Sequence, residues 1–355
     1  MSRPEDGPRL QLNPAQAPFP KPLVIPIFIP HEGCPHCCIF CNQHRISGQG
    51  ETPVSAGVVA ETIRAWLDRA DLRKRRQVQV AFYGGSFTGL PAERQQTLLA
   101  AVQPYLEQGM VHTIRLSTRP DYIDGQRLDL LCRHGVGIVE LGVQSCDDYL
   151  LHLAGRGHSC ADTVRAATLI KQTNLCLGMQ LMLGLPGQTF GALRRTVSRV
   201  IELRPDFVRL YPVLVLKGSG LDALYQRGGY RPLSLARAVL QAAYMKKRFD
   251  DQGITVVRMG LQPGPELENS LVAGPYHPAF GELVKSRLML RQIRRILAHV
   301  PAGQPVTLVI NDRDQSIVRG LHSQNLQRLR RIGLLDRFTL RTDPNQLRHT
   351  VGVAD

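Results

Sequence analysis

The stretch "LVIPIFIPHEGCPHCCIFCNQ", residues 23–43, joins an apolar, β-branched run to a turn that is crowded with cysteines. The run at 23–29 predicts a buried strand. The turn that follows it holds Cys34, Cys37, Cys38 and Cys41. Such a group of thiols could form a disulfide hub, a zinc site, a redox pair or an iron–sulfur site. These four sites belong to different folds, so the choice among them decides the rest of the interpretation.

Composition narrows the choice. The chain has 355 residues, of which 43% are hydrophobic and 21% charged, as in a globular protein with a sizeable core. Eight cysteines are too few for a disulfide scaffold. Residues 1–22 lack the apolar segment of a signal peptide, and the longest apolar run is too short to cross a bilayer. We therefore expect a flexible N-terminal tail, a cytoplasmic location and no membrane partner, which weakens the disulfide hypothesis.

The charge balance favours an anionic partner. Lys and Arg number 44 against 29 Asp and Glu, which gives a formal net charge of +15. Such an excess favours nucleic acid first, and nucleotide or coenzyme A-like metabolites second. Solubility, or a composition rich in arginine, would explain the same excess.

Short β-branched runs alternate with helical patterns from residue 23 to about 258. The runs lie at 23–29, 77–83, 112–118, 137–143, 175–183, 207–215 and 254–259. Several are almost continuously apolar, as expected for strands buried on both faces. Helical periodicity follows N-cap signals at Ser55, Ser159 and Ser234, and another helix is expected between Pro91 and Gly109. Six or seven such units predict an α/β fold with a parallel sheet, either doubly wound or a complete or partial (β/α) barrel. Functional residues should then follow the strands, at their C-terminal ends.

The last part of the chain has a different pattern. Residues 283–300 and 323–334 have the pattern of basic helices, with a strand at 305–311 between them. From 282 onward there are 13 Lys and Arg against 6 Asp and Glu. We therefore predict three parts, namely a tail at 1–22, a barrel domain at 23–281 and a small basic α+β module at 282–355. The segment 272–286 is either a loop over the barrel mouth or a plain connector.

The spacing of the cysteines favours a cluster. Structural zinc sites usually place their two C-x₂-C pairs on separate knuckles, whereas here the two pairs adjoin. A thioredoxin-like pair needs only two thiols. Taken without Cys37, the turn reads C-x₃-C-x₂-C, with Cys34, Cys38 and Cys41 as ligands to three irons of a [4Fe–4S] cluster. The fourth iron is then open to a substrate, and Phe40 beside the last thiol would shield the site.

This C-x₃-C-x₂-C turn after a first strand resembles that of the radical S-adenosylmethionine (SAM) superfamily. The resemblance implies a complete or partial (β/α) barrel and SAM bound at the open iron. It also implies reductive cleavage of SAM to a 5′-deoxyadenosyl radical, with the electron supplied by an external donor such as ferredoxin or flavodoxin.

Motifs at the ends of the later strands support the resemblance. "FYGGSFTGLP" at 82–91 looks like the superfamily's glycine-rich turn for the SAM amino group, "STRPD" and "GVQS" follow the third and fourth strands, and "GRGHS" begins a helix. The residues at this rim are Gly84, Gly85, Ser117, Arg119, Gln144, Arg156 and Tyr211. An arginine at a helix start suits a carboxylate. Ordinary turns and strand caps would produce similar patterns, although not five times in one chain.

Residues 24–240 resemble a narrower family, the radical SAM half of the catalytic subunit of the Elongator complex. The motifs are "STRPDYID" at 117–124, "VELGVQSCDDYLLHLAGRGH" at 139–158 and "LYPVLVLKGSGLDALYQRGGY" at 210–230. The resemblance implies that Gly84, Gly85, Ser117, Gln144 and Arg156 contact SAM and that the substrate is tRNA, at the wobble uridine. That family continues into an acetyltransferase domain, whereas residues 282–355 show no glycine-rich pyrophosphate loop.

Three functions remain open at this stage. The leading hypothesis is a radical SAM enzyme that modifies RNA, with tRNA as its partner. The second keeps the radical chemistry but acts on a small metabolite or a tetrapyrrole. The third is a metal-bearing regulator that binds nucleic acid without catalysis. A tRNA methylthiotransferase fits less well because the scattered cysteines do not supply a second three-cysteine cluster.

Overall fold

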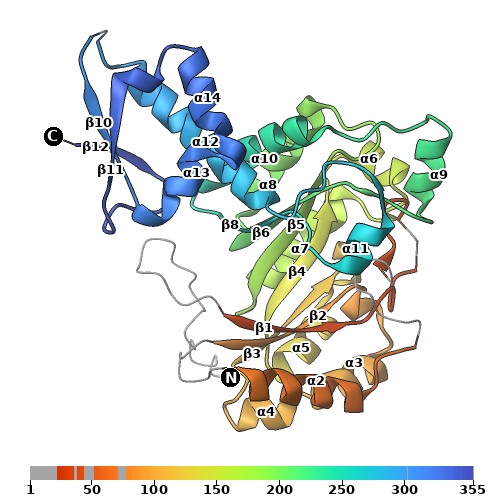
Figure 1. The fold of residues 1–355 in the computed structure, drawn as a ribbon. Coiled ribbons are helices and arrows are strands. Elements are labelled where there is room, and N and C mark those ends of the chain that lie inside the picture. Colours follow the sequence, from red (N-terminus) through yellow and green to blue (C-terminus); the bar gives the residue numbers. More distant parts are fainter. Residues whose placement is uncertain (1–21, 36–37, 44–51, 71–76, 302, 355) are drawn as a thin grey trace.

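The computed structural model describes residues 22–35, 38–43, 52–70, 77–301 and 303–354. The predicted tail and Cys37 therefore lie outside the described residues, apart from Pro22. The main sheet has seven parallel strands in the order β1-β2-β3-β4-β5-β6-β8. They are β1 Leu23–Phe28, β2 Val78–Tyr83, β3 Thr113–Thr118, β4 Val136–Gln144, β5 Cys176–Leu183, β6 Phe207–Pro212 and β8 Thr255–Met259. The sheet curls into an open half-barrel (Figure 1), which confirms the predicted fold class.

Helices follow the strands along the chain, and most of them cover the outer side of this half-barrel (Figure 1). They are α2 Ala56–Arg69, α3 Ala92–Ala100, α4 Gln103–Glu107, α5 Gly125–Arg133, α6 Asp148–Leu153, α7 Cys160–Lys171, α8 Phe190–Leu203, α9 Gly220–Gln226 and α10 Leu235–Asp250. The predicted N-caps Ser55, Ser159 and Ser234 each accept a hydrogen bond from their helix. The single helix predicted between Pro91 and Gly109 is wrong, because α3 ends before Pro104 and α4 begins around it. Proline has no N–H to continue the earlier helix.

The two faces of the sheet differ in chemistry. The outer face packs apolar side chains such as Val80, Leu116 and Leu141 against the helices. The inner face carries polar residues at the alternate positions, among them Arg115 and Glu140. The expectation that the strands are apolar on both faces is therefore wrong for the central strands. Their charged residues are buried inside the half-barrel, where they form an ion-pair network.

The predicted strand at 207–215 is divided. β6 ends at Pro212, and the chain then forms β7 Val215–Leu216, which pairs antiparallel with β9 Leu271–Ala273. α11 Pro265–Ser270 directly precedes β9 in the chain. The segment 272–286 is not one loop, since β9 occupies its start and a long helix begins at Phe280. Tyr276 packs against Leu267 and donates a hydrogen bond to Glu268 at 2.5 Å.

The C-terminal part forms a small α+β module beside α10 (Figure 1), as predicted. Its elements are α12 Phe280–Leu297, β10 Val306–Ile310, α13 Gln315–Arg319, α14 Gln324–Arg331, β11 Phe338–Thr342 and β12 Val351–Val353. β10 lies in the centre of a three-stranded sheet. The boundary proposed at 281/282 lies within α12, whose start packs in the main core and whose later residues pack in the module. No helix in the described part of the chain is long and apolar enough to cross a membrane.

Candidate functional site

The cysteine turn follows β1 and is held by backbone hydrogen bonds at both sides. Within the turn, the Cys34 N–H donates to His31 and the Cys41 N–H donates to Cys38. Between the two cysteines, the Ile39 N–H donates to the carbonyl of Ala154, at the end of α6, while its own carbonyl accepts from Leu221, in α9. The turn is thus fixed to segments that lie more than a hundred residues further along the chain.

The glycine-rich turn after β2 packs directly against the cysteine turn. An added Cβ on Gly85 would overlap the carbonyl oxygens of Ile29 and Glu32, and one on Gly33 would overlap that of Ser86. Gly84 has a φ of +95°, in the region that favours glycine. The sequence predicted a close backbone approach at Gly84 and Gly85, and the structure places the cysteine turn against Gly85.

Three described thiols influence one another in this turn. Burial raises the pKa of Cys34, and Cys38 raises it further, while Arg156 opposes the shift. Burial and then Cys38 raise the pKa of Cys41 to about 12, although Gln43 donates to its sulfur. Cysteine binds a metal as the thiolate, so these two thiols must lose their protons before they can act as ligands. A strongly positive group, such as a metal centre, would lower their pKa values and stabilise the thiolates. Phe40 lies half-buried in the small apolar cluster behind the turn.

The described residues contain no group of three or more His, Cys, Asp or Glu side chains that could hold one metal ion. A [4Fe–4S] cluster does not need such convergence, because each of its cysteines binds a different iron atom. Thiols are the side chains that hold such a cluster, so the described cysteines of the turn fit it in their chemistry.

Arg156 connects the cysteine turn to the end of β4. Its Nη1 donates to the sulfur of Cys38 at 3.4 Å and its Nη2 donates to the Gly142 carbonyl at 2.7 Å. Among the described residues, its buried Nε has no hydrogen-bond partner. Arg119, fully buried, bonds to Asp121 through Nε and Nη2, and its Nη1 also has no partner. Two buried guanidinium groups thus keep N–H donors beside the thiols, which suits an anionic ligand such as a carboxylate.

Two further buried groups near Arg156 have unpartnered acceptor atoms. Gln144 has a φ of +62°, an unusual conformation for this residue type, and its Oε1 has no hydrogen bond. The Nε2 of His158 lies 3.3 Å from the Val143 carbonyl, so that nitrogen carries the proton and the unpartnered Nδ1 is an acceptor. Burial and the Arg156 cation lower the pKa of His158 to about 3. Backbone strain and orphaned polar atoms often mark functional sites.

A buried ion-pair network occupies the inside of the half-barrel. Glu140 accepts from Arg115 Nε at 3.0 Å and from Tyr83 at 3.1 Å, and its Oε2 lies 2.8 Å from Arg209 Nε. Burial opposes ionisation of Glu140, but Arg209 and Arg115 hold its pKa below the usual range. Gln180 completes the network by donating to Glu140 and to Ser117.

Two of the predicted SAM residues belong to this network. Ser117 accepts the hydrogen bond of Gln180 at 3.0 Å, and Tyr211 interacts electrostatically with Arg209. The prediction placed both at the rim but missed Glu140, Arg115 and Arg209. The sequence did contain a signal for these three residues. Each is a charged residue in the middle of an apolar run, and the alternation of side chains along a strand would have placed it on the inner face.

The described site therefore combines a parallel half-barrel, a three-thiol turn after its first strand and a rim of glycines and buried arginines. Family models match in the same place. The model of the radical SAM superfamily covers residues 28–200, and that of the radical SAM C-terminal domain covers 205–289. The chain belongs to the radical SAM superfamily.

Within that superfamily the chain is similar in its radical SAM half to tRNA uridine(34) acetyltransferases. It is 28% identical over 250 residues to a tRNA uridine(34) acetyltransferase of Methanocaldococcus infernus. The aligned region covers 60% of this chain and 47% of that protein. It is 30% identical over 212 residues to the Escherichia coli K12 protein YhcC, covering 59% of this chain and 66% of that one. The structure of M. infernus Elp3 shares the fold, with a TM-score of 0.59 at 23% identity over 76% of this chain and 63% of that chain. The chain spans about half the length of the tRNA uridine(34) acetyltransferases that it matches.

Proposed function

We propose that Cys34, Cys38 and Cys41 hold a [4Fe–4S] cluster and that SAM binds beside it. The observation that supports this most directly is the guanidinium of Arg156 against the Cys38 sulfur, with a buried donor left over. Arg156 and Arg119 would hold the carboxylate of SAM by charge-assisted hydrogen bonds. When bound and reduced, the cluster supplies the electron that cleaves SAM to the 5′-deoxyadenosyl radical.

The other predicted rim residues have supporting roles in this proposal. Gly84 and Gly85 let the backbone approach the ligand and the cysteine turn. Gln144 and His158 each offer a buried acceptor without a partner, and SAM has amino and hydroxyl donors. Phe40 and the apolar cluster behind it exclude water from the thiols. The electron would come from an external donor such as ferredoxin or flavodoxin.

We further propose that the substrate is RNA, with tRNA as the first candidate. The support in the structure is a groove of ≈ 440 Å³ between α10 and α12, lined by Arg287, Arg291, Arg294 and Arg295. None of these four forms an ion pair with an acidic residue of the described chain. Burial together with Arg328, Arg294 and Arg291 lowers the pKa of Arg287, which reflects crowded positive charge. Phosphates would neutralise it. The relatives named as tRNA uridine(34) acetyltransferases support the same substrate class.

The experiment that tests both parts measures 5′-deoxyadenosine release from SAM. Protein reconstituted anaerobically with iron and sulfide is given a reductant, with and without bulk tRNA. We expect release that tRNA stimulates. Release that is indifferent to RNA would remove RNA as the substrate while leaving the radical chemistry, and no release from protein with a full cluster would remove the proposal altogether.

Substitutions separate the two parts of the proposal. Arg291→Ala with Arg294→Ala should weaken tRNA binding and lower the slope of log affinity against log salt by about 1 to 2, without changing iron content. Arg165→Ala is the matched control, because Arg165 is an exposed helical arginine that pairs with Asp162. Equal effects of the two changes would contradict a specific RNA surface.

The ligand assignment has its own test. Replacing Cys34, Cys38 or Cys41 by Ala should each abolish bound iron, whereas Cys37→Ala should retain it. Iron and sulfide analysis of the reconstituted variants measures this. An iron-free Cys37→Ala protein with native circular dichroism would refute the three-ligand assignment.

The inner network supports a second candidate. Arg115, Arg209 and Glu140 together carry one excess positive charge inside the half-barrel. A small anionic metabolite or a tetrapyrrole with carboxylates would be attracted to that interior. This candidate predicts 5′-deoxyadenosine release that depends on the metabolite and RNA binding no stronger than that of any basic protein.

A further inference from the structure

Three aromatic side chains on the helices around the arginine groove have no role in the proposed chemistry. Tyr149 on α6 is 67% exposed, and Phe190, the first residue of α8, is 48% exposed. Tyr244 on α10 is half-buried and lines the groove together with the arginines of α12. Large apolar groups that are exposed at neighbouring positions often mark a binding surface.

These three rings lie close together on the surface. The rings of Phe190 and Tyr244 meet at a centroid distance of 5.1 Å and an interplanar angle of 65°. Gly187 lies in the loop just before Phe190, and a Cβ added to it would be 3.9 Å from Cε1 of Tyr149. The rings therefore form a series that runs from α6, past the loop before α8, to α10.

This series of rings joins the two parts of the proposed site. At one end, Tyr244 lines the arginine groove, and α10 packs against both α8 and α12 (Figure 1). At the other end, α6 leads to Ala154, whose carbonyl binds the cysteine turn, and to Arg156, whose guanidinium contacts the Cys38 sulfur. A polymer that lies in the groove can therefore reach the SAM site along these rings.

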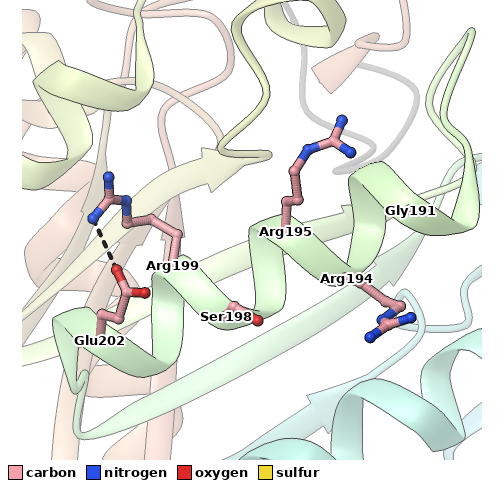
Figure 2. A pocket seen from close by; sticks show the side chains of 6 residues that line it. All are labelled: Gly191, Arg194, Arg195, Ser198, Arg199 and Glu202. Carbon is pink, nitrogen blue, oxygen red and sulfur yellow. Dashed lines mark hydrogen bonds and ion pairs between the residues drawn. The ribbon is translucent and has the colours of Figure 1, made fainter.

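Positive charge accompanies the rings on α8 as well. A hollow of ≈ 530 Å³ along this helix is lined by Gly191, Arg194, Arg195, Ser198, Arg199 and Glu202 (Figure 2). Arg199 pairs with Glu202 there, whereas Arg194 forms no ion pair with a residue of the described chain. Arg194 lies one helical turn after Phe190, so the two residues share one face of α8. Cations thus stand beside the rings on both α8 and α12.

Exposed rings beside arginines that lack acidic partners match the chemistry of an unpaired nucleic acid strand. Arginines hold its phosphates, while each ring offers a flat apolar face on which any base can stack. We propose that Tyr149, Phe190 and Tyr244 form a stacking platform that leads an unpaired RNA strand from the arginine groove to the SAM site. Bases inside a duplex are already stacked and paired, so a duplex could use the arginines but not the rings. This role rests on the proposed RNA substrate and adds that the recognised segment is single-stranded.

Equilibrium binding to the reconstituted full-length protein tests the platform. Fluorescence anisotropy compares a labelled oligouridine of about 12 nucleotides with an RNA duplex of the same length at one salt concentration. Tyr149→Leu and Phe190→Leu keep an apolar side chain but remove the ring, and each should weaken oligouridine binding about tenfold. Neither should change duplex binding or the slope of log affinity against log salt, because no charge is removed.

Trp66→Leu is the matched control for these changes. Trp66 is 38% exposed on α2, which lies on a different part of the molecule from α8 and α10 (Figure 1). Its replacement also removes an exposed ring, and it should leave the affinity for oligouridine unchanged. A loss of affinity equal to that of Phe190→Leu would overturn the assignment of stacking to the platform.

The outcomes also separate the platform from the proposed RNA surface. Arg291→Ala with Arg294→Ala should weaken the binding of both RNAs and lower the salt slope. If that variant loses affinity while the leucine variants bind oligouridine like the unmodified protein, the RNA surface stands and the platform is overturned. The rings would then be left to an apolar partner such as another protein. If the unmodified protein binds neither RNA, the proposed substrate falls, and the platform falls with it.

Photocrosslinking locates the bound bases. Oligouridine that carries iodouridine is irradiated in complex with the protein, and the crosslinked peptides are identified by mass spectrometry. We expect crosslinks at Tyr149, Phe190 or Tyr244. Crosslinks at other aromatic residues only, or no crosslink from a bound oligonucleotide, would overturn the proposal.

Discussion

Glu140→Gln is the sharpest test of the inner network, because it removes one charge and keeps the shape of the side chain. Glu140 is fully buried, and it faces Arg115 with an Nη2–Oε1 distance of 2.5 Å and Arg209 with an Nε–Oε2 distance of 2.8 Å. The amide retains one acceptor oxygen, so Tyr83 can keep a hydrogen bond, but two guanidinium groups lose their anion. Breaking a buried ion pair from one side costs about 3 to 5 kcal/mol of unfolding free energy. We expect the lower end of that range.

Urea denaturation followed by far-UV circular dichroism measures the change. Asp251→Asn is the matched control, because Asp251 pairs with Lys247 while both side chains are nearly half-exposed, and it should cost less than about 1 kcal/mol. Glu140 has a native pKa below its usual range. Its contribution is therefore complete above the unfolded pKa of about 4.3 and is lost as the pH falls through the native pKa. Equal shifts of the two urea midpoints at neutral pH would refute the ion-pair reasoning.

Three further predictions concern the rim of the site. Arg156→Lys should weaken SAM binding about tenfold or more, measured by equilibrium dialysis, with iron content unchanged, because lysine cannot reproduce the planar fork. His158→Gln should flatten the dependence of unfolding free energy on pH. The native pKa of His158, about 3, lies below the unfolded value of about 6.5. The unmodified protein therefore loses about 2 kcal/mol of unfolding free energy between pH 7 and pH 5, and the variant does not have this loss. Urea midpoints at both pH values measure this, and parallel loss in both proteins would contradict it. Gly85→Ala should lower iron incorporation and destabilise the protein by about 1 to 3 kcal/mol. Iron analysis and urea denaturation measure these two effects. Gly125→Ala is the control and should show neither effect, because a Cβ added there meets open space.

The parallel half-barrel could be predicted from the sequence because its strands are short apolar runs separated by helices with clear N-caps. Ser55, Ser159 and Ser234 each cap the predicted helix. The division of the helix after Pro91 was harder to foresee. Its apolar spacing continues across Pro104, and only the missing N–H interrupts the backbone hydrogen bonding. The end of β6 at Pro212 was missed for a related reason, since β-branched residues continue beyond it.

The inner network could not be placed from the sequence alone. Glu140, Arg115 and Arg209 lie on different strands, and their contact depends on the register of the parallel sheet. Gly178 on β5 is paired on one side with Glu140 on β4 and on the other side with Phe207 on β6. This register brings the side chains of Glu140, Arg115 and Arg209 into the same interior. Sequence spacing gives the alternation within a strand but not the neighbour across it.

The glycine pair after β2 illustrates how a correct motif can have more than one physical cause. Its sequence suggested a backbone that approaches SAM closely. In the structure, Gly85 is already required for another reason, because the carbonyl groups of Ile29 and Glu32 leave no space for a Cβ. The Ser86 N–H then donates to the Glu32 carbonyl, so the second strand's turn holds the start of the cysteine turn in place. Gly84 contacts no backbone as closely and has a positive φ. Loss of iron is therefore the expected signature of a change at Gly85, and weaker SAM binding with the cluster intact is the expected signature of a change at Arg156.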